Sequence, residues 1–141
     1  MILELNATPE EVMRAVETMQ EYGRERGVNE KDLFALALAL EECGSNVVNH
    51  GLKGNPQHKF RVIINHAPGT MSLELRDPGP AFDPTIATVS DPSESGDDDR
   101  PPGGWGISLV RRYIDEIRYQ RESEENVLRL MKRLTPDLPK E

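Results

Sequence analysis

The feature that most constrains this sequence is an apolar stripe with helical spacing in its first third. Small and aliphatic residues recur every three or four positions, at Leu33, Leu36, Ala37, Leu40, Gly44 and Val47. On an α-helix such residues share one face, and that face must be buried against other elements. Asn29 supplies a capping side chain and Gly51 interrupts the pattern, so we expect a helix from Asn29 to about His50.

Shorter patterns on either side predict one layer of helices and one layer of strands. Thr8 and Pro9 are typical of a helix start, and the apolar spacing that follows them stops between Gly23 and Gly27. Residues 107–114 resume helical spacing, and alternating or β-branched segments predict strands at 2–5, 59–66, 71–76, 116–121 and 127–133. The expected fold is α+β, a two-layer sandwich with a mixed, mainly antiparallel sheet covered on one face by helices.

The length and charge of the chain limit what this sandwich can be. Its 141 residues are enough for a single domain, 1–141, and the one cysteine, Cys43, excludes an internal disulfide framework. A net charge of −8 argues against direct nucleic-acid binding, and the apolar runs are too short to span a membrane. We expect a cytoplasmic domain in which residues from about 84 to 104, which lack periodicity, form either a lid or a solvated linker.

A polar stripe runs along the predicted second helix, on a face other than the apolar one. Glu42, Asn46 and His50 follow one another at intervals of four residues, and Asn49 lies beside them. The carboxylate could accept a proton, the amide oxygen could bind a hard cation, and the imidazole could meet a phosphate. A solvated helix edge would show the same residues. Cys43, next to Glu42, is expected to pack in the core and not to act as a nucleophile.

Two glycine-containing segments could complete a nucleotide site. Asp77 and Gly79 follow a predicted strand, where the carboxylate could accept the amino group of adenine and the glycine would leave room for a base or ribose. The same Asp-Pro-Gly-Pro sequence is also favourable turn chemistry. Residues 103–106 (GGWG) lead into a helix, which would let backbone N–H groups approach a phosphate, although a glycine-rich hinge would look the same.

The three segments, in this order and spacing, resemble the N, G1 and G2 boxes of the GHKL ATPase/kinase superfamily. The matching motifs are Glu42-x-x-x-Asn46-x-x-x-His50-Gly51, Asp77-x-Gly79-x-x-Phe82-Asp83 and Gly104-x-Gly106-x-x-Leu109. The resemblance covers nearly the whole chain. Within the superfamily, its stand-alone length is similar to that of the bacterial anti-sigma-factor serine/threonine kinases.

This resemblance implies a Bergerat-type fold that binds ATP and Mg²⁺. It assigns Asn46 to the magnesium ion, Glu42 to the base that acts on a protein serine or threonine hydroxyl, and Asp77 to the adenine. The other residues that it places around the nucleotide are Asn49, His50, Gly79, Phe82, Arg100, Gly103, Gly104, Trp105, Gly106 and Ile107. The implied partners are an antagonist protein that receives the phosphate, a sigma factor, and a second copy of the chain in a homodimer.

One departure from the family pattern bears on catalysis. Related kinases often have a basic residue shortly before the second-box glycines, where this chain has Pro101 and Pro102, with Arg100 close by. Because phosphoryl transfer depends on positioned positive charge, loss of that charge would slow transfer more than it weakens ATP binding. The alternatives to a kinase are an ATP-binding regulatory switch with little or no catalysis, and a detached histidine-kinase-like ATPase domain.

Overall fold

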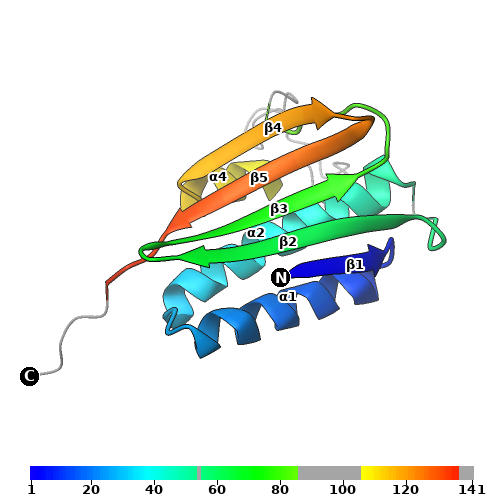
Figure 1. The fold of residues 1–141 in the computed structure, drawn as a ribbon. Coiled ribbons are helices and arrows are strands. Elements are labelled where there is room, and N and C mark those ends of the chain that lie inside the picture. Colours follow the sequence, from blue (N-terminus) through cyan, green and yellow to red (C-terminus); the bar gives the residue numbers. More distant parts are fainter. Residues whose placement is uncertain (54, 86–105, 137–141) are drawn as a thin grey trace, which may run out of the picture.

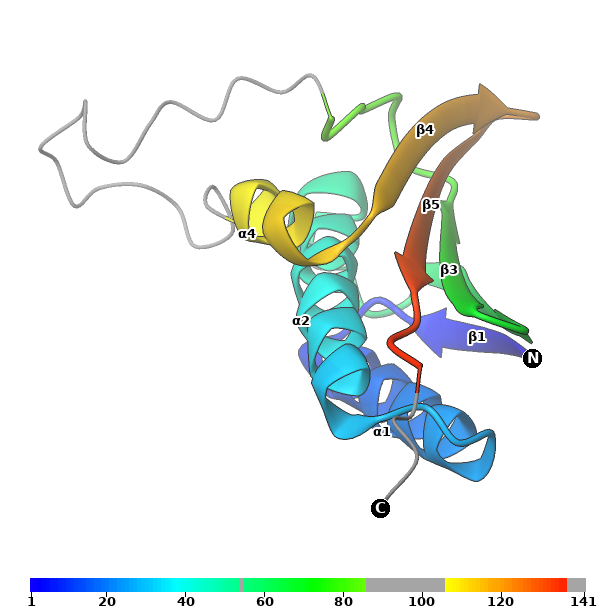
Figure 2. The ribbon, with the colours of Figure 1, turned by 90° about the vertical axis from the view of Figure 1, so that its left-hand side faces the viewer.

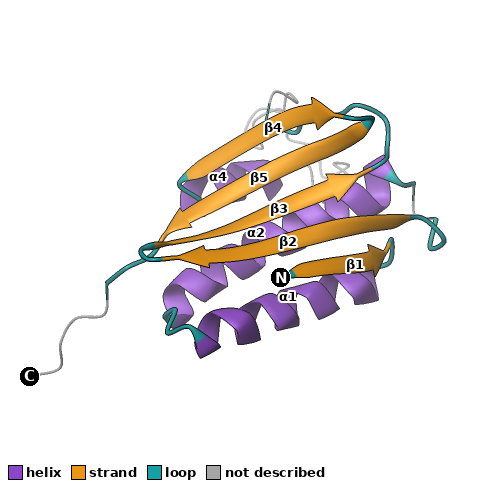
Figure 3. Cartoon of the chain, in the orientation of Figure 1, coloured by secondary structure: helices purple, strands orange, loops and turns teal. Residues whose placement is uncertain are grey.

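Five strands form one sheet, and the helices lie against one of its faces (Figure 1). The structure is a computed structural model that describes residues 1–53, 55–85 and 106–136. Figure 3 shows the same separation into a helical layer and a strand layer. None of the helices in the described ranges is long and apolar enough to cross a membrane. In chain order the elements are β1 (Ile2–Asn6), α1 (Pro9–Glu25), α2 (Glu30–Asn46), η1 (Val47–Gly51), β2 (Lys59–Ala67), β3 (Thr70–Asp77), α4 (Gly106–Tyr113), β4 (Glu116–Glu122) and β5 (Glu125–Arg133).

The strand order is β1-β2-β3-β5-β4, and every neighbouring pair is antiparallel. The connection through α4 carries the chain from β3 to the far edge of the sheet, where β4 lies. The β4–β5 hairpin then brings β5 back beside β3. Because β5 lies between β3 and β4, the described strands form no parallel pair. A mixed, mainly antiparallel sheet was expected, and the described sheet is antiparallel throughout.

The two long helices begin where capping side chains are expected, but the second ends earlier. Thr8 Oγ1 accepts the Glu11 N–H at 3.2 Å, and Asn29 Oδ1 accepts the Asp32 N–H at 2.8 Å. The α-helical part of α2 stops at Asn46, and a π-helical turn, η1, follows instead of α-helix to His50. A π turn has one more residue in each hydrogen-bonded ring, so the buried position moves from Val47, as expected from the stripe, to Val48, which is 2% exposed.

The hydrophobic core lies between the helical layer and the inner face of the sheet (Figure 2). Leu33, Leu36 and Leu40 of the predicted stripe are almost completely buried there. A Cβ at Gly44 would lie only 3.0 Å from Cγ1 of Val12, so the glycine of the stripe lets α1 and α2 approach closely. The sheet contributes Val62, Ile64, Leu73, Leu75 and Leu130 to this core.

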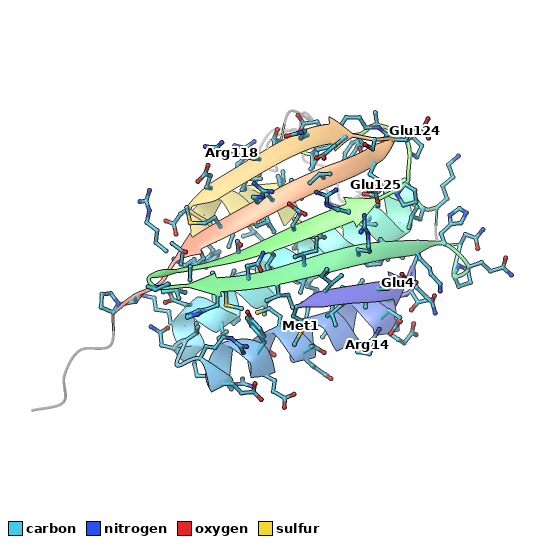
Figure 4. The ribbon with its side chains drawn as sticks, viewed as in Figure 1. Met1, Glu4, Arg14, Arg118, Glu124 and Glu125 are labelled. Carbon is cyan, nitrogen blue, oxygen red and sulfur yellow. The ribbon has the colours of Figure 1, made fainter. Side chains whose placement is uncertain are left out.

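Ion pairs occupy the other face of the sheet, where Figure 4 shows Arg118 and Glu125. Glu74 accepts from Arg76 at 2.7 Å and from Arg129 at 2.6 Å, and Arg61 pairs with Glu125 at 2.9 Å. Glu74 is buried, whereas Arg129 is exposed and Arg61 is partly exposed, and ion pairs made by exposed side chains contribute little to stability individually. Together they keep polar the face that carries no helix in the described chain. The pocket described below lies on the opposite, helical side of the sheet.

Candidate functional site

A pocket lies where the end of α2 and η1 meet the end of β3. Apolar side chains form most of its wall, and Asn46, Asp77 and Asn126 are the polar groups that converge on it. Apolar walls with a few placed polar groups are typical of small-molecule sites. The described residues that line it are Cys43, Asn46, Val47, Gly51, Leu75, Asp77, Phe82, Pro84, Tyr119, Asn126 and Leu128.

Asp77, at the end of β3, is 5% exposed and is held in one orientation. The described residues donate two hydrogen bonds to it, both to Oδ1, from the Gly79 N–H at 2.9 Å and from Asn126 Nδ2 at 3.1 Å. Burial raises the pKa of the Asp77 carboxyl, although these hydrogen bonds and the nearby charge of Arg121 oppose the rise. The described residues thus leave Oδ2 to accept a hydrogen bond from a ligand.

The Asp-x-Gly turn is packed directly against the end of η1. A Cβ at Gly79 would lie 2.6 Å from the carbonyl oxygen of Gly51 and 2.8 Å from Oδ1 of Asp77. A Cβ at Gly51 would in turn lie 3.3 Å from the same Asp77 oxygen. Packing within the protein therefore requires a glycine at position 79, whether or not the glycine also leaves room for a ligand.

Glu42 and Asn46 lie one helical turn apart on α2, and both side chains are partly buried. Asn46 forms part of the pocket wall. Burial raises the pKa of the Glu42 carboxyl, and the negative charge of Glu41 adds to the rise. Cys43 between them is 3% exposed, and burial raises the pKa of its thiol to about 12, which confirms the expected packing role.

The structure gathers some of the expected nucleotide residues in the pocket and leaves others away from it. Asn46, Asp77 and Phe82 line it, with Gly79 beside Asp77. Asn49 and His50 are exposed on η1, because the α-helical stripe gives way to the π turn before it reaches them. Ile107 is buried in the core, and Gly106 begins α4. Arg100, Gly103, Gly104 and Trp105 lie outside the described residues.

Residues 5–132 match the family of histidine kinase-like ATPase domains. This chain belongs to that family. The expected GHKL-type resemblance and α+β fold are thereby confirmed.

Two known proteins are similar to this ATPase domain. The serine/threonine-protein kinase BtrW of Bordetella bronchiseptica is 32% identical over 104 residues, which are 74% of this chain and 72% of BtrW. The RsbU and RsbW domains of Rv1364c from Mycobacterium tuberculosis provide a solved structure with a TM-score of 0.64 and 17% identity. That match covers 97% of this chain and 33% of the other, and at 17% identity it supports the fold alone.

Asn126 and Tyr119 line the pocket of this histidine kinase-like ATPase domain but lie outside the three sequence motifs. Asn126 lies directly opposite Asp77 in the β3–β5 pairing, and the Tyr119 hydroxyl donates to Asn126 Oδ1. One sequence signal could have found Asn126. It occupies an inward-facing position of β5, in the alternating row that continues with Leu128 and Leu130.

The chemistry of the pocket fits an adenine nucleotide that carries a magnesium ion. The available acceptor of Asp77 suits the exocyclic amine of adenine, and the rings of Phe82 and Tyr119 provide apolar surface for a base. Asn46 could give Mg²⁺ one amide oxygen, while phosphate and water oxygens commonly supply the rest. Within the described residues no group of three or more His, Cys, Asp or Glu side chains is arranged to hold a metal ion by itself.

Proposed function

We propose that this domain is an ATP-dependent serine/threonine protein kinase. The observation that carries the proposal is the convergence of Asn46 from α2 and Asp77 from β3 on one pocket, two residues that lie far apart in the sequence. The 32% identity to a protein named as a serine/threonine kinase supports phosphoryl transfer as the chemistry.

In this proposal Asp77 accepts the amine of adenine and Asn46 binds the magnesium ion. Bound ATP supplies the γ-phosphoryl group. Glu42 accepts the proton of a serine or threonine hydroxyl while the hydroxyl oxygen bonds to the γ-phosphorus. The bond from that phosphorus to the bridging oxygen breaks, and ADP leaves. The raised pKa of Glu42 brings its basicity closer to that of an effective base at neutral pH.

The partners are proposed from the family resemblance to anti-sigma-factor kinases. The phosphate acceptor would be an antagonist protein, and the domain would also bind a sigma factor, as a homodimer in the cytoplasm. Regulation of transcription would then follow from sequestering the sigma factor, without contact between this acidic chain and DNA.

The test uses two neighbouring glutamates that differ in burial. Glu42→Gln should reduce phosphoryl transfer from labelled ATP to a candidate antagonist by about 10²-fold or more, because proton transfer by a positioned base contributes about that much. ATP affinity measured by calorimetry with Mg²⁺ should change by less than about threefold, since in this proposal Glu42 does not contact the adenine ring. Glu41→Gln, an exposed neighbour with the same chemical change, is the matched control. Transfer at the wild-type rate by Glu42→Gln would show that the base is another group.

An ATP-responsive switch with little catalysis is the second candidate, and Pro101-Pro102 in place of a basic residue favours it. Such a switch would bind ATP and change its affinity for a partner without producing a phosphoprotein. A detached histidine-kinase-like domain would instead produce a phosphate that acid removes from its target, whereas phosphate on serine or threonine survives acid. The labelling experiment therefore separates all three.

A further inference from the structure

Asn126 occupies an inward-facing position of β5, in a row whose next two members are Leu128 and Leu130. In the β3–β5 register Asn126 lies opposite Asp77, and the next inward pairs are Leu75 with Leu128 and Leu73 with Leu130. Asn126 is 6% exposed. An amide so deeply buried is costly unless its hydrogen bonds are made within the protein.

In the described chain, the side-chain hydrogen bonds of Asn126 are made to the turn from Asp77 to Phe82 and to Tyr119. Nδ2 donates to Asp77 Oδ1 at 3.1 Å and to the carbonyl of Pro80 at 2.9 Å, with the carbonyl of Gly79 further away at 3.4 Å. Oδ1 accepts the N–H of Phe82 at 3.1 Å and the hydroxyl of Tyr119.

This arrangement uses the full capacity of the side chain and fixes its orientation. A side-chain amide has two N–H donors and two lone pairs on its oxygen, and each of these is engaged by protein atoms. The reversed amide would place its oxygen against three acceptors, so only one orientation satisfies the surroundings. Asn126 therefore has no donor or acceptor left for a ligand, and any effect on binding must pass through the groups that it holds.

We propose that Asn126 is the positioning residue of base recognition: it holds the Asp77 carboxylate and the turn from Gly79 to Phe82 in the one arrangement that presents Oδ2 of Asp77 to a nucleobase amine. The inference rests on the proposed adenine-nucleotide site. Arg121 on β4 supports the same turn, because its Nη1 donates to the Gly79 carbonyl at 2.7 Å.

Asn126→Asp tests the proposal because it keeps the shape of the side chain and removes its donors. The introduced carboxylate could still accept from Phe82 and Tyr119, but it would face the Asp77 carboxylate without a hydrogen bond. We expect ATP affinity, measured by calorimetry with Mg²⁺, to fall at least about tenfold. Affinity for GTP, whose guanine carries a carbonyl oxygen where adenine has its 6-amino group, should change by less than about twofold, so the preference for ATP should fall at least about fivefold.

The matched control is Asn65→Asp, the same chemical change at an exposed position of β2. It should leave both affinities and their ratio unchanged. If Asn126→Asp does not unfold cooperatively, the same affinities are measured on Asn126→Ser. That variant adds no charge and also removes the hydrogen bonds by which Asn126 holds Asp77 and the turn. Retention of the ATP preference by the folded variant would overturn the inference, whereas a loss of stability alone would lower both nucleotide affinities together.

The pH dependence of ATP binding gives a readout that a purely structural role would not move. Asp77 faces the Asn126 amide, and the charges of Arg121 and Glu125 also act on it. In Asn126→Ser, which removes the hydrogen bond to the Asp77 carboxylate without adding a charge, the pH at which half of the ATP affinity is lost should rise, because that hydrogen bond lowers the pKa of Asp77. If that pH were unchanged in the folded variant, the proposal that Asn126 holds the Asp77 carboxylate would be wrong.

The wild-type protein and the Asp77→Asn variant separate this inference from the function beneath it. If the wild-type domain does not bind ATP, both the proposed function and the inference fail. If the wild type prefers ATP and Asp77→Asn loses that preference while Asn126→Asp keeps it, only the role of Asn126 is wrong.

Discussion

A buried carboxylate such as Asp77 is stable as a charge only if hydrogen bonds or cations replace the water that it loses. Two hydrogen bonds reach its Oδ1, and Arg121 lies close enough to lower its pKa, yet burial outweighs them and the pKa remains raised. The native protein therefore bears an electrostatic cost at neutral pH. In the proposed function an amine bound at Oδ2 offsets part of that cost, so Asp77 would serve binding and not stability.

Asp77→Asn should therefore separate stability from binding. A carboxyl whose pKa is higher in the folded than in the unfolded state makes the protein more stable as the pH falls through the folded-state pKa towards the unfolded one. The variant, which cannot ionise, should be more stable than the wild type at pH 8, and the difference should shrink towards pH 4. Its ATP affinity at pH 8 should fall about tenfold or more, because an amide N–H would face the adenine amine.

Urea denaturation at several pH values and calorimetry measure the two effects. Glu17→Gln, which removes one exposed charge from α1, is the control and should show neither. A variant less stable than the wild type at pH 8 would mean that the Asp77 charge stabilises the fold.

Among the elements, η1 connects the first two motifs physically. Because the chain makes a π turn after Asn46, the carbonyl of Gly51 lies against Gly79. It is so close that a Cβ on residue 79 would clash with the carbonyl oxygen. The N-box helix and the Asp-x-Gly turn are thus joined by backbone packing before any ligand is considered. This contact positions Asn46 and Asp77 relative to each other.

Gly79→Ala tests that contact. Its Cβ would meet a backbone oxygen at 2.6 Å, which cannot move aside cheaply, so we expect a loss of about 1–3 kcal/mol in the free energy of unfolding. Gly51→Ala should cost less, because its nearest contact is a side-chain oxygen at 3.3 Å. Urea denaturation of the two variants and the wild type measures the order. Equal stability of all three would show that the two segments do not press on each other.

The elements also show which parts of the fold can be predicted from sequence. The caps at Thr8 and Asn29 involve residues three positions apart, so local pattern was sufficient to predict both helix starts. The π turn could not be predicted, because the spacing of apolar residues over so few positions does not distinguish α-helical from π-helical hydrogen bonding. Asn126 was missed because its partners Asp77 and Phe82 are 49 and 44 residues away in the sequence. Motif order predicted Asn46 and Asp77, but not the side chain that holds one of them.

Across the whole molecule, α2 is attached to the sheet at both of its ends. Its site end is fixed by the packing of η1 against Gly79, and its first turn is fixed by Asp32, which is 2% exposed. Asp32 Oδ2 accepts the N–H of Thr135 at 2.7 Å, and Oδ1 accepts the Thr135 hydroxyl at 3.2 Å. Thr135 follows β5, the strand that carries Asn126. The start of the N-box helix is therefore held by the same part of the chain that holds Asp77.

Asp32→Ala should lower the free energy of unfolding by about 2–3 kcal/mol, because it removes a buried charged acceptor and leaves the Thr135 N–H without its partner. Thr135→Val, which removes only the hydroxyl donor, should cost about 1 kcal/mol. Both changes lie at the end of α2 away from the pocket, so ATP affinity of the folded protein should stay within about twofold of the wild type. Urea denaturation and calorimetry measure these effects. A tenfold loss of ATP affinity in either variant would mean that the first turn of α2 also helps to position Asn46. The contact between Gly51 and Gly79 would then not be sufficient to position it.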